Sequence, residues 1–167
     1  MQRIYLLSTG GTIEKVYSEQ RGVVENRAAK LDRYLRMLRL PDAEVRAEHL
    51  MNKDSLEMTG ADRARVRDRV AELLPDGAPI VISHGTDTMV ETGRFLEASF
   101  PDLRTPIVLT GAMTPLGFEG SDALQNLTES LLAVRLVAPG VYIVMHGQVF
   151  PVSHARKDKE RATFVWA

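Results

Sequence analysis

Short apolar segments alternate along this chain with longer segments of helical spacing, and this alternation limits the folds that the chain can adopt. The apolar segments predict strands at residues 4–7, 79–83, 106–110 and 141–145, and residues 45–50 are predicted as a further strand. Short strands separated by helices are typical of a parallel sheet that is covered on both faces. We therefore predict an α/β fold, doubly wound around a mainly parallel sheet, in a single domain that spans residues 1–167.

Helices are predicted between these strands, where apolar residues recur every three or four positions. The first carries its apolar face between residues 31 and 38 and ends at Pro41, after a segment up to about residue 26 that is predicted as a polar loop. Thr59 and Asp62 have the chemistry of a helix start, and residues 75–77 end that helix. Further helices at 89–100 and 122–137 complete a Rossmann-like layout.

The composition excludes several classes of protein. The net charge is −1 and basic residues are scattered, so no broad surface for nucleic acid is expected. The absence of cysteine removes disulfides, thiol catalysis and thiolate metal sites. The sequence also has no apolar stretch long enough to cross a bilayer and no signal-peptide pattern at its start, so we expect no membrane partner and a cytoplasmic location.

Polar and glycine-rich residues follow one predicted strand after another, at 9–12, 52–57, 84–88, 111–113 and from 146 onward. In open parallel sheets, ligands bind beyond the carboxyl ends of the strands, near a switch in strand order. Helix starts after several of these loops add partial positive charge. The layout therefore predicts a cleft for a small anionic ligand.

Several common site chemistries do not fit these loops. The pair Gly10-Gly11 has neither the spacing nor the lysine of a nucleotide-binding loop, and no G-x-S-x-G elbow occurs. The histidines are far apart in sequence and form no metal-binding motif, so no metal or other cofactor is predicted. His84, which precedes Gly85, is interpreted as a structural histidine whose ring bonds the backbone.

Threonine hydroxyls, carboxylates and a lysine remain as candidates for chemistry. A hydroxyl is a poor nucleophile unless a neighbouring base takes its proton, and a buried lysine can serve as that base. Thr12 is displayed at the first strand end, and Thr86, Asp87 and Lys157 can form such a relay. Two structural alternatives stay open: Asp87 as the cap of the helix that follows it, and Lys157 as part of a solvated charge run at 156–161.

Two of these segments carry a family resemblance. Thr9-Gly10-Gly11-Thr12-Ile13 and His84-Gly85-Thr86-Asp87-Thr88-Met89 resemble the two signature motifs of the bacterial-type L-asparaginase and glutaminase-asparaginase family. Residues 54–58, 110–115 and 149–157 are similar as well. The resemblance implies an amidohydrolase that converts asparagine to aspartate and ammonia through a covalent acyl-enzyme, with asparagine strongly preferred over glutamine.

The resemblance also implies roles for individual residues. Thr12 is similar to the family's nucleophile, and Thr86 with Lys157 to the pair that handles protons behind it. Asp87 matches the residue that pairs with the substrate's α-ammonium group. The implied substrate contacts are completed by Ser55 at the α-carboxylate, the Ala112 backbone at the side-chain amide, Glu57 and Tyr17.

Some positions depart from the family pattern. Leu56 stands where the family usually has a glutamine beside the carboxylate-binding serine, with Glu57 next to it. Tyr17 is nearer to Thr12 in sequence than the family's flap tyrosine is to the nucleophile. The family's usual carboxyl-terminal domain has no counterpart here, so a short-chain form is expected.

Two further questions are whether the domain is catalytic and whether it self-associates. A non-catalytic amino-acid-binding or regulatory domain is the competing interpretation, but a mere binder needs no proton relay such as Thr12, Thr86 and Lys157. The apolar terminus at 162–166 predicts an exposed strand edge and hence a homo-oligomer, at least a dimer. The alternative is that this terminus folds back on its own domain as a sixth strand.

Overall fold

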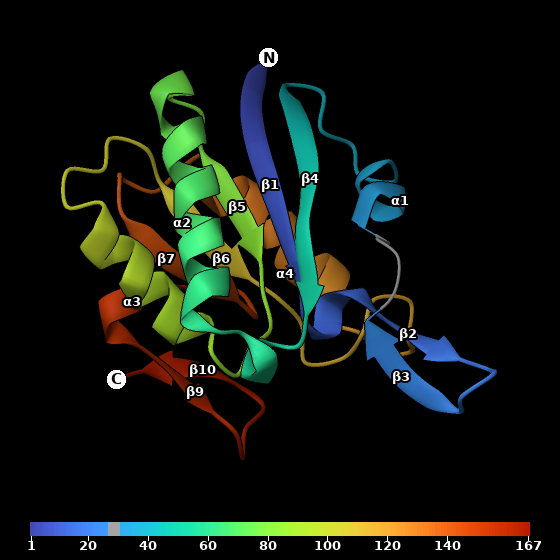
Figure 1. The fold of residues 1–167 in the computed structure, drawn as a ribbon. Helices are drawn as coiled ribbons and strands as arrows, with labels where there is room; N and C mark the ends of the chain where they lie inside the picture. The colour runs from blue at the N-terminus through green and yellow to red at the C-terminus, as the bar shows by residue number, and fades with distance from the viewer. Residues whose placement is uncertain (27–30) are drawn as a thin grey trace.

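The computed structural model describes residues 1–26 and 31–167 and has a six-stranded sheet at its centre (Figure 1). The strand order is β4-β1-β5-β6-β7-β8, in which all neighbours are parallel except β7 and β8. The predicted doubly wound, mainly parallel α/β fold is thus confirmed. The strands are β1 (Gln2–Gly10), β4 (Ala43–Lys53), β5 (Ile80–Ser83), β6 (Ile107–Thr110), β7 (Val141–Met145) and β8 (Gln148–Pro151).

Helices cover both faces of this sheet, and each face has its own apolar core. Leu7 and Ile82 belong to the core beneath α2 and α3, whereas Leu6 and Val81 belong to the core beneath α4. This division follows from the strand geometry, because successive side chains point to opposite faces. The helices are α1 (Leu31–Leu35), α2 (Gly60–Leu73), α3 (Met89–Ser99) and α4 (Ala123–Ala133).

The helix boundaries agree with the sequence where a local cap defines them. The Thr59 hydroxyl accepts from the Asp62 N–H and the Asp62 carboxylate accepts from the Thr59 N–H, which is a complete capping box at the start of α2. The first helix is shorter than predicted, because α1 ends at Leu35 and residues 36–38 form a turn. Among the described residues, no helix has the length and apolar content needed to cross a membrane.

The predicted polar loop before residue 26 is wrong. Residues 15–26 form an antiparallel hairpin of β2 (Lys15–Ser18) and β3 (Val23–Asn26), which projects from the sheet in Figure 1. Tyr17, Val23 and Val24 are exposed in this hairpin. The strands are held by main-chain pairing rather than by burial, so an apolar periodicity does not reveal them.

The chain terminus also differs from the prediction. β9 (Ala155–Asp158) and β10 (Thr163–Trp166) form a hairpin outside the main sheet, with Phe164 fully buried. The terminal strand therefore has a partner within the chain along one edge. Its other edge pairs with no strand of the described residues, and Trp166 is 58% exposed, so the predicted exposed edge persists in part. The alternative is correct in that the terminus folds back on its own domain, with Phe164 in the core, but it is wrong about a sixth strand of the main sheet, because β8 holds that place.

Phe164 should be a principal anchor of this hairpin. Phe164→Ala leaves a large void under β10, so we expect the free energy of unfolding to fall by about 3–5 kcal/mol. Trp166→Ala is the matched control, because the Trp166 side chain is 58% exposed and the change should cost clearly less. Urea denaturation of both variants measures the difference, and equal losses would contradict the assigned anchor.

Candidate active site

The two signature loops meet where the strand order reverses. β1 lies between β4 and β5, so the chain crosses to one side of the sheet after β1 and to the other side after β5. The loops that follow these two strands begin side by side, at a switch point of the strand order. Gly11 has a φ of 81°, and a Cβ added to it would lie 2.4 Å from the Gly85 nitrogen. The backbones of the two loops are therefore in direct contact. Thr12, which begins the 3-10 turn η1 (Thr12–Glu14), is held beside the loop that carries Thr86.

A third loop completes this contact. Ser55 begins the 3-10 turn η2 (Ser55–Glu57) and is 2% exposed. A Cβ added to Gly85 would lie 2.6 Å from the Ser55 hydroxyl oxygen, and the Thr88 hydroxyl donates to the Ser55 carbonyl at 2.9 Å. The tertiary structure thus brings the loops of Thr12, Ser55 and Thr86 together at the carboxyl end of the sheet.

Lys157 reaches the same place from the terminal hairpin. Its ammonium group donates to the Thr86 hydroxyl at 2.7 Å and to an Asp87 carboxylate oxygen at 2.8 Å. Thr86 is buried and the Lys157 side chain is only 16% exposed. Lys157 is therefore not part of a freely solvated charge run. Asp87 is not the cap of α3 either, because Thr88 holds the N-cap position and Asp87 pairs with Lys157.

Ala112 lies in the loop after β6, next to the Thr86 loop. A Cβ added to Gly111 would lie 3.4 Å from the Thr86 methyl group, and Ala112 itself is fully buried. Asp122 holds this loop by accepting from the Met113 and Thr114 N–H groups at 3.0 Å. The segment around Ala112 is thus fixed beside Thr86.

His146 supports this arrangement from the end of β7. Its Nε2 is 2.7 Å from an Asp122 carboxylate oxygen and its Nδ1 is 2.7 Å from the Thr163 hydroxyl on β10. Burial works to raise the pKa of Asp122, but the Met113 and Thr114 N–H groups and His146 together hold that pKa below its usual value. Sequence reasoning missed the link, because Asp122 and His146 are distant in the chain and match no motif.

His84 has the structural role that the sequence indicates. Its Nδ1 is 2.7 Å from the Gly85 carbonyl oxygen and its Nε2 is 2.8 Å from the Thr92 hydroxyl. Burial, the largest cause, lowers the pKa of His84 to about 4. The ring is therefore neutral at pH 7 and serves to fix the loop of Gly85.

Two predicted substrate contacts lie at the periphery. Tyr17 is on β2 with 57% of its surface exposed, and Glu57 is exposed at the end of η2. Leu56, the residue that departs from the family pattern, is 71% exposed. These side chains point to solvent here, and their contact with substrate stays a prediction.

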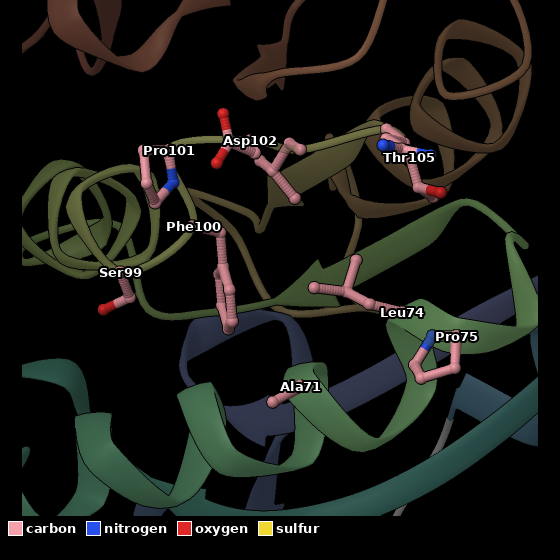
Figure 2. A pocket seen from close by; sticks show the side chains of 10 residues that line it. Ala71, Leu74, Pro75, Ser99, Phe100, Pro101, Asp102 and Thr105 are labelled. Carbon is pink, nitrogen blue, oxygen red and sulfur yellow. The ribbon is translucent and has the colours of Figure 1, made fainter.

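One clear hollow of the surface is separate from this site. It has a volume of about 420 Å³ and lies between the ends of α2 and α3, where Figure 2 shows Ala71, Leu74 and Phe100 around it. None of the candidate catalytic residues lines it. Among residues 1–26 and 31–167, no group of three or more histidine and carboxylate side chains is arranged to hold a metal ion.

Comparison with known proteins gives a consistent result. The family description "Asparaginase, N-terminal" matches residues 3–164. The chain is 29% identical over 147 residues to an L-asparaginase of Thermococcus kodakarensis, covering 88% of this chain and 45% of that protein. It is 34% identical over 154 residues to a glutamyl-tRNA(Gln) amidotransferase subunit from Aeropyrum pernix, covering 88% and 35%. The chain thus spans less than half the length of these curated relatives.

Solved structures agree with the sequence comparison. The thermostable L-asparaginase from Thermococcus kodakarensis superposes with a TM-score of 0.85 at 28% identity, over 99% of this chain and 51% of that one. L-asparaginase I from Vibrio cholerae superposes with a TM-score of 0.80 at 28% identity, again over 99% and 51%.

The contact of Gly11 with Gly85 can be tested with a matched pair of variants. Gly11 and Gly77 both have positive φ, but a Cβ on Gly77 meets open space. Gly77→Ala should cost about 1–2 kcal/mol of unfolding free energy from backbone strain alone. Gly11→Ala should cost clearly more, because the methyl group also separates the two loops. Equal costs by urea denaturation would show that the loops are not in contact.

Proposed function

This chain belongs to the family of asparaginase N-terminal domains. We propose that it is an amidohydrolase that converts L-asparagine to L-aspartate and ammonia. The observation that carries the proposal is the contact of Lys157 with Thr86 and Asp87, beside the loop of Thr12. A binding domain needs a carboxylate for the ammonium group of its ligand. It does not need a largely buried lysine that forms a hydrogen bond with a threonine hydroxyl.

The proposed reaction begins with attack of the Thr12 hydroxyl oxygen on the side-chain carbonyl carbon of asparagine. The ammonium form of Lys157, which donates to Thr86 and Asp87, must first lose a proton to solvent, because only the neutral amine can act as the base. The amine then takes a proton from Thr86, which takes the Thr12 hydroxyl proton, and the ammonium so formed returns a proton to the amide nitrogen so that the C–N bond breaks. Ammonia leaves and an ester to Thr12 remains. Water activated by the same relay then hydrolyses the ester and releases aspartate.

Substrate binding is assigned to the loops around this relay. We assign the α-ammonium group to Asp87, the α-carboxylate to Ser55 and the amide to the backbone at Ala112. An ion pair in a partly buried site gives specificity, since an unpaired charge there is costly. Tyr17 and Glu57 are assigned to the rim, where movement of the hairpin or of η2 can bring them to the ligand.

A second function is favoured by particular relatives. Several are named as subunits of glutamyl-tRNA(Gln) amidotransferases, at 31–35% identity. In that alternative, the chain releases ammonia for a partner protein and is a poor hydrolase alone. A homo-oligomer also stays a prediction, with the unpaired edge of β10 and the exposed Trp166 as its reason. A cytoplasmic location is supported by the neighbour described as a probable cytoplasmic L-asparaginase from Campylobacter jejuni.

Removal of the proposed relay should abolish hydrolysis without unfolding the protein. Thr12→Ala should lower kcat with asparagine at least about 1,000-fold, and Thr86→Val should act similarly. Lys157→Met should lower kcat at least about 100-fold and change the pH profile of kcat. Lys159→Met is the matched control, since Lys159 is exposed in the same segment. Near-native turnover of any relay variant in an ammonia-release assay removes that residue from the mechanism.

Substrate choice separates the two functions. A ligand held at both α-groups presents its amide at a fixed distance from Thr12, so glutamine, with one more methylene, is misplaced. We expect kcat/KM for asparagine to exceed that for glutamine by at least about 10- to 200-fold. Comparable values would defeat this geometry. Ammonia release that requires an added amidotransferase partner would instead favour the second function.

A further inference from the structure

An ion pair that no sequence motif indicates joins two of the loops at the site. The Lys15 ammonium donates to an Asp54 carboxylate oxygen at 2.7 Å. Lys15 directly follows η1 and donates its backbone N–H to the Thr12 carbonyl, while Asp54 directly precedes Ser55. The pair therefore connects the turn of the proposed nucleophile with the turn of the proposed carboxylate-binding serine.

Asn26 makes a second connection at the same place. With its side-chain amide assigned in the orientation that satisfies both neighbours, the Asn26 nitrogen donates to the Gly11 carbonyl at 2.8 Å and its oxygen accepts from the Asp54 N–H at 3.2 Å. Lys15 and Asn26 are paired across the base of the β2–β3 hairpin. Both ends of the hairpin are thus fastened to the segment around Asp54, whereas its outer part extends away from the sheet (Figure 1).

The environment of Asp54 indicates that the ion pair is well formed. The hydrogen bond from Lys15 is the largest cause that holds the pKa of Asp54 below its usual value; the Leu56 N–H and the positive charge of Lys157 also lower the pKa. The Lys15 and Asp54 side chains are 23% and 33% exposed, so solvent screens their attraction only in part. The carboxylate is charged at neutral pH and available to Lys15.

We propose that Lys15 and Asp54 are positioning residues that fasten the Thr12 turn and its hairpin to the Ser55 loop. This inference rests on the proposed hydrolysis, because the role given to the ion pair is to keep the nucleophile Thr12 at a fixed distance from Ser55, which binds the substrate carboxylate. An error of about 1 Å in such a spacing can cost about 100-fold in rate. The pair acts through Thr12 and Ser55 and does not itself touch the reacting atoms.

A second ion pair, which lies within the hairpin, provides a matched control. Arg21 lies 2.6 Å from Glu25, but this pair stays within the hairpin and Arg21 is 67% exposed. Arg21→Met therefore removes a salt bridge of similar length without releasing the hairpin from the body. Asp54→Asn is the informative change at the other end, because an asparagine oxygen can still accept from the Leu56 N–H and keep the cap of η2.

The kinetic test uses the purified full chain with asparagine. Lys15→Met and Asp54→Asn should each lower kcat/KM about 10- to 100-fold, with kcat and KM both affected. The double variant should fall no further than the worse single variant, because both changes break one interaction. Lys15→Arg should remain within about threefold of the parent, since it keeps the charge. Arg21→Met should match the parent.

Hydrogen exchange tests the fastening without any activity. In Lys15→Met and Asp54→Asn, amides of residues 15–26 should exchange faster, while those of β1 and α3 keep their protection. A parent protein that does not hydrolyse asparagine, together with these exchange changes, would defeat the proposed function and leave the fastening supported. Unchanged exchange, additive losses in the double variant, or an equal kinetic loss in Arg21→Met would each overturn the positioning role.

Discussion

The close approach of Gly11 to Gly85 is the constraint on which the rest of the site depends. The parallel sheet brings the ends of β1 and β5 side by side, and only residues without a Cβ allow the two loops to touch. Ser55 then packs against Gly85 from β4's side of the sheet. The loops that carry Thr12, Ser55 and Thr86 converge because their backbones pack directly against one another at Gly11 and Gly85.

Charged groups complete the site from two hairpins that lie outside the main sheet. Lys157 on β9 pairs with Asp87, and Lys15 at the start of β2 pairs with Asp54. The positive charge of Lys157 also lowers the pKa of Asp54. Two lysine–carboxylate pairs thus lie at the loops that follow the strands. Partial burial of these pairs makes them more effective than exposed surface pairs, which contribute little.

The loops that follow β5 and β6 are fixed by other contacts. His84 holds the Gly85 carbonyl as a buried neutral ring, and Asp122 holds the two N–H groups after Ala112. His146 connects Asp122 to Thr163, which stands on the same hairpin as Lys157. The backbone near the proposed amide position and the lysine of the relay therefore share one support.

The sequence by itself determined the strands with continuous apolar runs, the capped start of α2, and the loops at which polar residues gather. Each depends on local patterns: burial of a whole strand, a Thr59–Asp62 box, or glycines at a strand end. The candidates Thr12 and Thr86 follow glycines at predicted strand ends, and Lys157 is predicted as the base for their hydroxyls. Ser55 is predicted only from the family resemblance.

Only the tertiary structure decided which of these residues meet. The β2–β3 and β9–β10 hairpins are short and are stabilised by main-chain pairing and by a few buried residues such as Phe164. The pairs Lys15–Asp54 and His146–Asp122 join positions far apart in the chain, and one charged residue in a sequence carries no sign of its partner. Their contacts follow from strand order and loop packing, which are properties of the whole fold.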